Sequence, residues 1–116
     1  MPSTWYSIVV DCHDITAQSR FWAEVLGYDV VFEAEEEVAL AKDDSTYPGL
    51  VFVPVPEAKT LKNRLHIDLN PDDQLAEVER LEKLGAKRID IGQGEVSWVV
   101  MADPEGNEFC AFPPRG

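Results

Sequence analysis

One short run of the sequence, RLHIDLN at residues 64–70, groups polar side chains that could do chemistry together. The run alternates between apolar Leu65, Ile67 and Leu69 and polar Arg64, His66 and Asp68. Alternation is typical of a β-strand with one buried face, so the polar side chains are predicted to share the other face, roughly 7 Å apart. The imidazole of His66 could then be a base or a hydrogen-bond partner for a ligand. The alternative is a histidine without a functional role, whose hydrogen bonds are made only to neighbouring polar residues.

Size and charge limit the kinds of partner. The chain has 116 residues, the size of one domain. Its 22 acidic and 10 basic residues give a net charge of −12. Nucleic acids and anionic membranes bind basic surfaces, so we expect neither as a partner.

The same sequence has features of a protein from a reducing cytoplasm. It has no apolar run long enough to cross a membrane, and its N-terminus lacks the basic and apolar regions of a signal peptide. Cys12 and Cys110 do not have the spacing of a disulfide framework or a zinc knuckle. We therefore expect a soluble, cytoplasmic protein.

One order of elements is used twice along the chain. Strands are predicted at residues 5–11, 29–34, 37–43 and 49–55, and again at 64–69, 87–91, 96–102 and 108–112, with helices at 14–27 and 71–84. Each half is strand–helix–three strands, with a period of about 59 residues. A polar, proline-marked linker at 54–63 joins the halves. Because each half has one helix for one sheet face, the uncovered faces are expected to meet and form a cup.

The ends of the two helices also have sequence signals. Gly27 and Gly85 are predicted to end them, and Asp14 to cap the start of the first. Asn70 is the predicted cap of the second, with Pro71 as its first helical residue. The predicted buried stripes contain Ile15, Phe21, Trp22, Val25 and Leu26 in the first helix, and Leu75, Val78, Leu81 and Leu84 in the second. The apolar face of the strand at 64–69 should pack beneath the second helix.

Three segments carry a resemblance to a known family. They are DITAQSRFWAEVLGY at 14–28, KNRLHIDLNPDDQ at 62–74 and MADPEGNEFCAF at 101–112. They resemble the glyoxalase-like subgroup of the glyoxalase/bleomycin-resistance/dioxygenase (vicinal oxygen chelate) superfamily. The resemblance implies one α+β domain over residues 1–116, with βαβββ repeats at about 4–56 and 63–113. It further implies an open cup of mixed β-sheet with both helices outside, and a homodimer.

The resemblance also implies where metal ligands would lie, namely on the first and last strands of each repeat. His66 matches one such position, but Ser7 is a poor ligand at another, and the strand LVFVPV at 50–55 offers none. Cys110 stands where the resemblance predicts a glutamate. Since a catalytic site usually needs about three protein ligands, we expect no metal cofactor. The alternative is a zinc-type site on His66 and Cys110.

Other residues could line the cup. Trp5 and Ser7 have the cup-facing parity on the first strand, and Trp98 is either a pocket wall or core. Cys110 is expected to be an inert buried thiol, the alternative being a nucleophile activated by His66. The candidate ligand-binding set is thus Trp5, Ser7, Arg64, His66, Asp68, Trp98 and Cys110.

Two classes of function follow from these expectations. The first is a small-molecule binding protein with a degenerate metal site and an unidentified ligand. The second is an enzyme, a metal-dependent glyoxalase-type lyase or a ring-cleaving dioxygenase. A third possibility is a cup that serves only for dimerisation.

Overall fold

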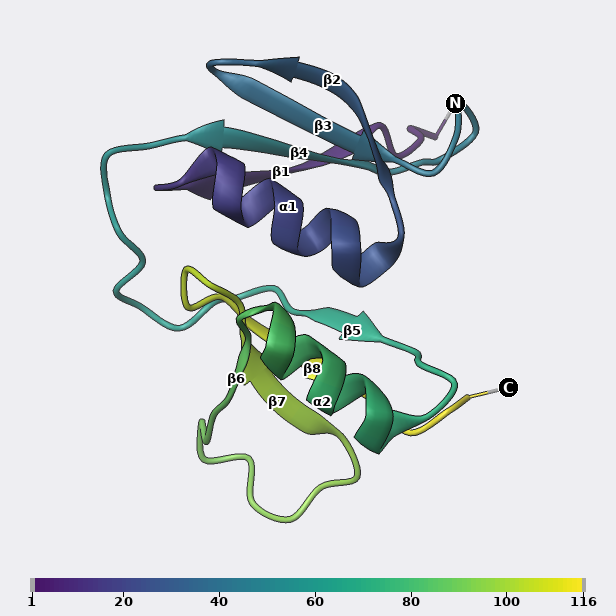
Figure 1. The fold of residues 1–116 in the computed structure, drawn as a ribbon, viewed down its shortest axis with the longest axis vertical. Coiled ribbons are helices and arrows are strands. Elements are labelled where there is room, and N and C mark those ends of the chain that lie inside the picture. The colour runs from purple at the N-terminus through teal and green to yellow at the C-terminus, as the bar shows by residue number, and fades with distance from the viewer. Residues whose placement is uncertain (1, 116) are drawn as a thin grey trace. The chain divides into compact units, whose positions relative to one another are not determined.

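A computed structural model describes residues 2–115, so Met1 and Gly116, the ends of the predicted domain, lie outside the described residues. The fold is α+β, with two helices and two four-stranded mixed sheets in the described part of the chain. The chain divides into two compact units, one ending at Ala58 and the other beginning at Lys59 (Figure 1). Each unit has the order βαβββ, which confirms the predicted tandem repeat.

The first unit follows the predicted order closely. Its elements are β1 (Ser7–Cys12), α1 (Ile15–Leu26), β2 (Asp29–Ala34), β3 (Glu37–Ala41) and β4 (Gly49–Pro54). The strand order across the sheet is β1-β4-β3-β2, with β1 parallel to β4 and the other neighbours antiparallel. Because β1 begins at Ser7, Trp5 precedes the strand that was predicted to contain it.

One face of the first sheet carries the core of the unit. Phe21 and Trp22 of α1 are buried, as predicted, and so are Leu40 and Phe52 on β3 and β4, the strands that α1 contacts. The opposite face is partly exposed and mainly apolar. A row of paired residues crosses it from strand to strand, made of Val9, Val51, Ala39 and Phe32.

The second unit repeats this topology with shorter strands. Its elements are β5 (Ile67–Leu69), α2 (Gln74–Leu84), β6 (Lys87–Arg88), β7 (Val99–Ala102) and β8 (Glu108–Ala111). The strand order is β5-β8-β7-β6, with β5 parallel to β8. The helix α2 contacts β6 and β8 and lies against the sheet (Figure 1). Its Val78 and Leu81 are buried, whereas Leu75 in its first turn is 66% exposed, contrary to the prediction.

The two helices are capped at equivalent points of the repeat. The side chain of Asp14 accepts a hydrogen bond from Ala17 N, and that of Asp73 accepts one from Ala76 N, both at 3.1 Å. The prediction of Asn70 as the second cap was therefore wrong. The Asn70 side chain instead accepts a hydrogen bond from the backbone N–H of Arg115, which ties the C-terminal segment to the start of this turn. Gly27 and Gly85 end the helices in the left-handed conformation, as predicted.

The predicted strand at 64–69 is only half formed. Ile67–Leu69 pair with β8, but Arg64 to His66 precede the strand, and Leu65 is 85% exposed instead of packed beneath α2. The reason is the length of the partner strand. β8 begins at Glu108, directly after the Asp103–Asn107 turn, so no strand is present for residues before His66 to pair with.

The segment between β6 and β7 also differs from the prediction. The strands predicted at 87–91 and 96–102 shrink to two and four residues, and a long loop spans residues 89–98. Gly92 and Gly94 in this loop have positive φ angles of 82° and 71°, which strands do not adopt. No helix within residues 2–115 is long and apolar enough to cross a membrane.

Candidate functional site

The register of the second sheet brings Asp68 and Cys110 together. Asp68 on β5 lies directly opposite Cys110 on β8, and Cys110 in turn lies opposite Val100 on β7. Paired residues share a sheet face, so these three side chains form a row on one face. Glu108, two residues before Cys110 on the same strand, shares that face. The pairing brings together two of the predicted ligand-binding residues, Asp68 and Cys110.

The thiol of Cys110 is held in its neutral form. The residue is only 6% exposed, and this burial is the main reason why its pKa is raised. The negative charge of Asp68 raises the pKa further, and the positive charge of Lys62 partly opposes the rise. Reactive cysteines need the opposite environment, one that lowers the pKa and exposes the sulfur. The arrangement therefore suits a packing residue better than a nucleophile.

His66 is engaged by Lys62, which no sequence pattern singled out. The Nζ atom of Lys62 lies 3.2 Å from the Nε2 atom of His66. A lysine ammonium can only donate, so Nε2 is the acceptor and the imidazole carries its proton on Nδ1. The lone pair of Nε2 is thus engaged in this contact. Residues 62–66 lie outside any strand, and the long lysine side chain, not strand parity, defines the surroundings of this histidine.

Glu108 holds the linker between the halves against the second sheet. It is 8% exposed, and its carboxylate oxygens have separate partners: Oε2 accepts from Lys59 Nζ at 2.8 Å and Oε1 from Asn63 N at 2.7 Å. Burial, the largest influence, raises the pKa of Glu108. The hydrogen bonds from Lys59 and Asn63 outweigh it and lower the pKa below its ordinary value. This contact fixes the backbone that leads into Lys62, Arg64 and His66.

The donor set does not fit a divalent metal ion. Within residues 2–115, no three His, Cys, Asp or Glu side chains are grouped so that they could hold one. His66 has Nε2 engaged by Lys62, and Glu108 has both oxygens engaged. Cys110 is buried with a raised pKa, although a metal would need its thiolate. His66, Glu108 and Cys110 would each have to lose a partner or a proton before binding a metal, and Asp68 alone is too few ligands for a site.

The first unit offers little polar chemistry on its exposed face. Ser7 is half-buried opposite Gly49, and alternation along β1 puts it on the face of Val9. The face positions of β4 are Val51 and Val53, which cannot bind a metal. Trp5 is exposed ahead of the strand. By the same alternation Asp11 of β1 and Glu37 of β3 lie on this face, so it is apolar along its central row and acidic at two strand ends.

Trp98 belongs to an aromatic cluster beside a small pocket. Its ring stacks on Phe112, with ring centroids 5.4 Å apart, and the Arg115 guanidinium lies 5.8 Å from the centroid of Phe112. Gln74 donates a hydrogen bond to the neighbouring carbonyl of Ser97, which helps to fix this part of the loop. Trp98 and Val100 both line a pocket of about 350 Å³, whose other lining residues are Arg88, Ile89, Gln93, Gly94, Glu95, Val96 and Val99. Val100 is thus shared between this pocket and the row that contains Asp68 and Cys110.

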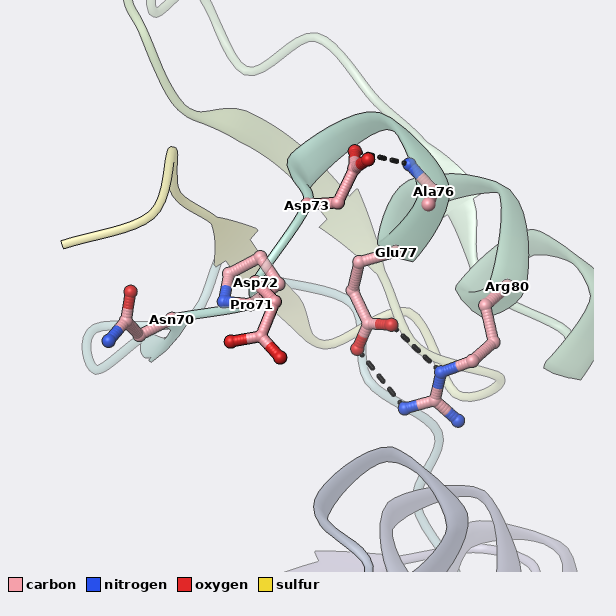
Figure 2. A pocket seen from close by; sticks show the side chains of 7 residues that line it. All are labelled: Asn70, Pro71, Asp72, Asp73, Ala76, Glu77 and Arg80. Carbon is pink, nitrogen blue, oxygen red and sulfur yellow. Dashed lines mark hydrogen bonds and ion pairs between the residues drawn. The ribbon is translucent and has the colours of Figure 1, made fainter. Parts of the chain in front are cut away.

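A larger hollow of about 430 Å³ lies at the start of α2 (Figure 2). Several of its polar groups are engaged by the chain itself: Asp73 caps the first turn, Arg80 forms a two-point ion pair with Glu77, and Asn70 accepts from Arg115 N. Figure 2 shows these contacts between the residues that line the hollow. We therefore place the candidate site on the sheet face of Asp68 and Cys110 and on the segment that carries Lys62, Arg64 and His66.

Comparison with known proteins relates this fold to a known family. A family model described as Glyoxalase-like domain matches residues 7–112. A comparison with curated proteins finds no match. Among solved structures, a glyoxalase/bleomycin resistance protein/dioxygenase family enzyme from Burkholderia phytofirmans PsJN is similar with a TM-score of 0.73 and 18% identity, over 97% of this chain and 100% of that one.

Two further solved structures have the same fold. The fosfomycin resistance protein FosX from Mesorhizobium loti has a TM-score of 0.71 and 17% identity, over 97% of this chain and 92% of that one. A bleomycin-binding protein complexed with bleomycin has a TM-score of 0.61 and 16% identity, over 97% and 100% of the two chains. Identities this low support a shared fold and leave the ligand open.

Proposed function

The chain belongs to the glyoxalase-like domain family, within the glyoxalase/bleomycin resistance/dioxygenase superfamily, and from this membership we propose that it binds a small organic molecule without a metal ion. The binding surface consists of His66, Arg64 and Asp68 with Lys62, backed by Cys110. We also propose Trp98 on the second unit and, separately, Trp5 and Ser7 on the first unit as ligand-binding residues. One of the solved structures with this fold is a bleomycin-binding protein in complex with bleomycin, which gives a precedent for this kind of role.

The observation that carries the proposal is the contact between Lys62 and His66. It presents an ammonium group and an imidazole N–H to a ligand, with Nε2 engaged as the acceptor. The metal-dependent lyase or dioxygenase alternative would need a metal ion to replace this contact and about two further ligands to join His66, and no group of three such residues lies within residues 2–115. We therefore favour binding over catalysis through a metal.

The test uses phenylnaphthylamine, a neutral apolar dye, because the natural ligand is unidentified. Its fluorescence titration should saturate with the wild-type protein, and His66→Ala should weaken the binding several-fold. His13→Ala is the matched control, since His13 is the other histidine of the chain, and it should leave the binding unchanged. Binding that His66→Ala leaves intact would contradict the assignment of this surface.

We further propose that the protein is a two-fold homodimer. The strand β2 is an edge strand whose residues are all exposed, and Val30, Val31 and Phe32 are three apolar side chains in succession on it. Such an edge favours association with another chain. The mass by light scattering at micromolar concentration should be that of a dimer, and Val31→Lys should shift it toward the monomer. A monomer mass for the wild type would contradict this.

We also propose that the two units act as one domain. The protein is further proposed to be located in a reducing, cytoplasmic compartment. Cys12 and Cys110 are both buried thiols outside any disulfide, which supports this environment. A single cooperative unfolding transition is expected if the units are one domain. Two separate transitions would contradict it.

A further inference from the structure

We infer that the ligand is an amphipathic organic anion, an apolar molecule with one carboxylate, sulfonate or phosphate group, and that residues 61–66 receive it. This inference rests on the proposed function and names the chemical class of its ligand. It rests on the side chains of the segment LKNRLH, which we call the 61–66 patch.

The apolar part of the 61–66 patch is unusually exposed. Leu65 is 85% exposed and Leu61 is 80% exposed, the highest values among the large hydrophobic side chains of residues 2–115. Leaving a leucine side chain in water forgoes the free energy that its burial would contribute. Two such residues so close in the sequence therefore indicate a surface that another molecule covers.

The charged part of the patch has no carboxylate partner. Lys59, Arg80 and Arg88 each form an ion pair with a glutamate. Lys62 instead contacts the neutral ring of His66, and neither Lys62 nor Arg64 pairs with an acidic side chain in the described part of the chain. The two cations are therefore available to an external anion.

The patch is held in place at both ends. Glu108 binds Lys59 Nζ, just before the patch, and Asn63 N, within it. Just after the patch, Ile67 pairs with Phe109 in the sheet. A segment fixed in this way loses less conformational freedom on binding than a free linker would. The exposure of Leu61 and Leu65 is thus a property of a positioned backbone.

The donors match an anionic group. The Lys62 ammonium has three N–H groups and uses one on His66, so two remain, and the Arg64 guanidinium adds a planar fork of donors. Hydrogen bonds between charged groups are roughly twice as strong as neutral ones. An anionic head would contact Lys62 and Arg64 while an apolar body covers Leu61 and Leu65.

A matched pair of dyes tests the inference. Anilinonaphthalene sulfonate is phenylnaphthylamine with one added sulfonate, so the two probes differ only in the anionic group. The double variant Lys62→Met/Arg64→Met should weaken binding of the sulfonate dye by about tenfold or more and that of the neutral dye less than about twofold. The control Arg20→Met/Lys83→Met removes the same charge from exposed helix positions and should affect neither dye.

The outcomes separate this inference from the proposed function. Leu61→Ser/Leu65→Ser should weaken both dyes, because the apolar body is common to them. If the neutral dye binds in a His66-dependent way but the two dyes respond alike to Lys62→Met/Arg64→Met, the anion preference is overturned and the binding function stands. If neither dye binds the wild-type protein, both are overturned. An equal loss of sulfonate-dye binding in the control variant would overturn the assignment to the 61–66 patch.

Discussion

The ammonium of Lys59 lies 2.8 Å from Oε2 of Glu108, although 48 residues separate the two in the sequence. Both side chains are largely removed from water, and the second carboxylate oxygen accepts the Asn63 N–H. This is the contact by which the linker between the two halves joins the last strand. It positions the residues that we assign to ligand binding.

Removing the charge of Glu108 should destabilise the protein. Glu108→Gln leaves the Lys59 ammonium in a mostly buried position without its anion, and we expect a loss of about 2 kcal/mol in the free energy of unfolding. Urea denaturation measures it. Glu36→Gln, at an exposed turn of the first unit, is the control and should change stability by less than about 0.5 kcal/mol. Equal effects of the two substitutions would show that the contact contributes little.

The same pair should make stability depend on pH in the acid range. The folded-state pKa of Glu108 is lowered from its ordinary value of 4.5, so the unfolded state binds the proton more readily. The contribution is therefore present above pH 4.5 and is lost as the pH falls through the lower folded-state pKa. The difference in stability between wild type and Glu108→Gln should shrink below about pH 4. A difference that stays constant from pH 7 to 3 would contradict this account.

Local sequence signals predicted the ends of the helices well. They failed where the length of a strand depends on the strand it pairs with. The caps Asp14 and Gly27 lie next to the helix they bound, so their neighbours in the sequence suffice. In the run NPDD, three residues could cap α2, and only the internal repeat distinguishes them: Asp73, not Asn70, lies one period after Asp14. The strand at 64–69 was predicted too long because its length depends on where β8 begins.

The residues of the candidate site likewise divide into those that strand periodicity could place and those that it could not. Asp68 and Cys110 could be placed on one face from strand periodicity, and the same parity could have identified Glu108. Lys59 and Lys62 carry no such signal. They lie in an irregular segment, and they reach Glu108 and His66 through long, flexible side chains. Side-chain contacts of this kind depend on the tertiary path of the linker, which periodicity does not report.

The reactivity of Cys110 should respond in opposite directions to its two charged neighbours. The charge of Asp68 raises the pKa of the thiol and that of Lys62 lowers it, and alkylation requires the thiolate. In a Cys12→Ser background, Asp68→Asn should speed alkylation of Cys110 by iodoacetamide at pH 8, and Lys62→Met should slow it. Mass spectrometry over time measures both rates.

Burial is the larger cause of the raised pKa, so both rates should stay far below that of a free thiol. Glu36→Gln in the same Cys12→Ser background controls for a general change of charge. The account is wrong if Asp68→Asn and Lys62→Met change the rate in the same direction while the melting temperature is unchanged.

The identity of the α2 cap can be tested by a matched pair of substitutions. Asp73→Ala removes the acceptor of the Ala76 N–H and should cost about 1 kcal/mol of unfolding free energy. Asn70→Ala removes only the contact with the exposed backbone N–H of Arg115 and should cost less. Thermal or urea denaturation compares them. A larger effect at Asn70 would restore the cap that the sequence alone suggested.

Divalent metal ions should leave the protein unaffected. A metal bound only to the folded state would raise its stability according to the concentration of free metal, by about 2.7 kcal/mol at one hundred times the dissociation constant. Because Nε2 of His66 accepts from Lys62, and Glu108 is held by Lys59 and Asn63, we expect no such rise with Zn²⁺, Ni²⁺ or Mn²⁺. The melting temperature with each ion and with a chelator should agree, and elemental analysis of the purified protein should find no stoichiometric metal. The opposite result is tested with His66→Ala and Cys110→Ser. A metal-dependent rise in the melting temperature of the wild type that both substitutions abolish would favour the metal-dependent lyase or dioxygenase.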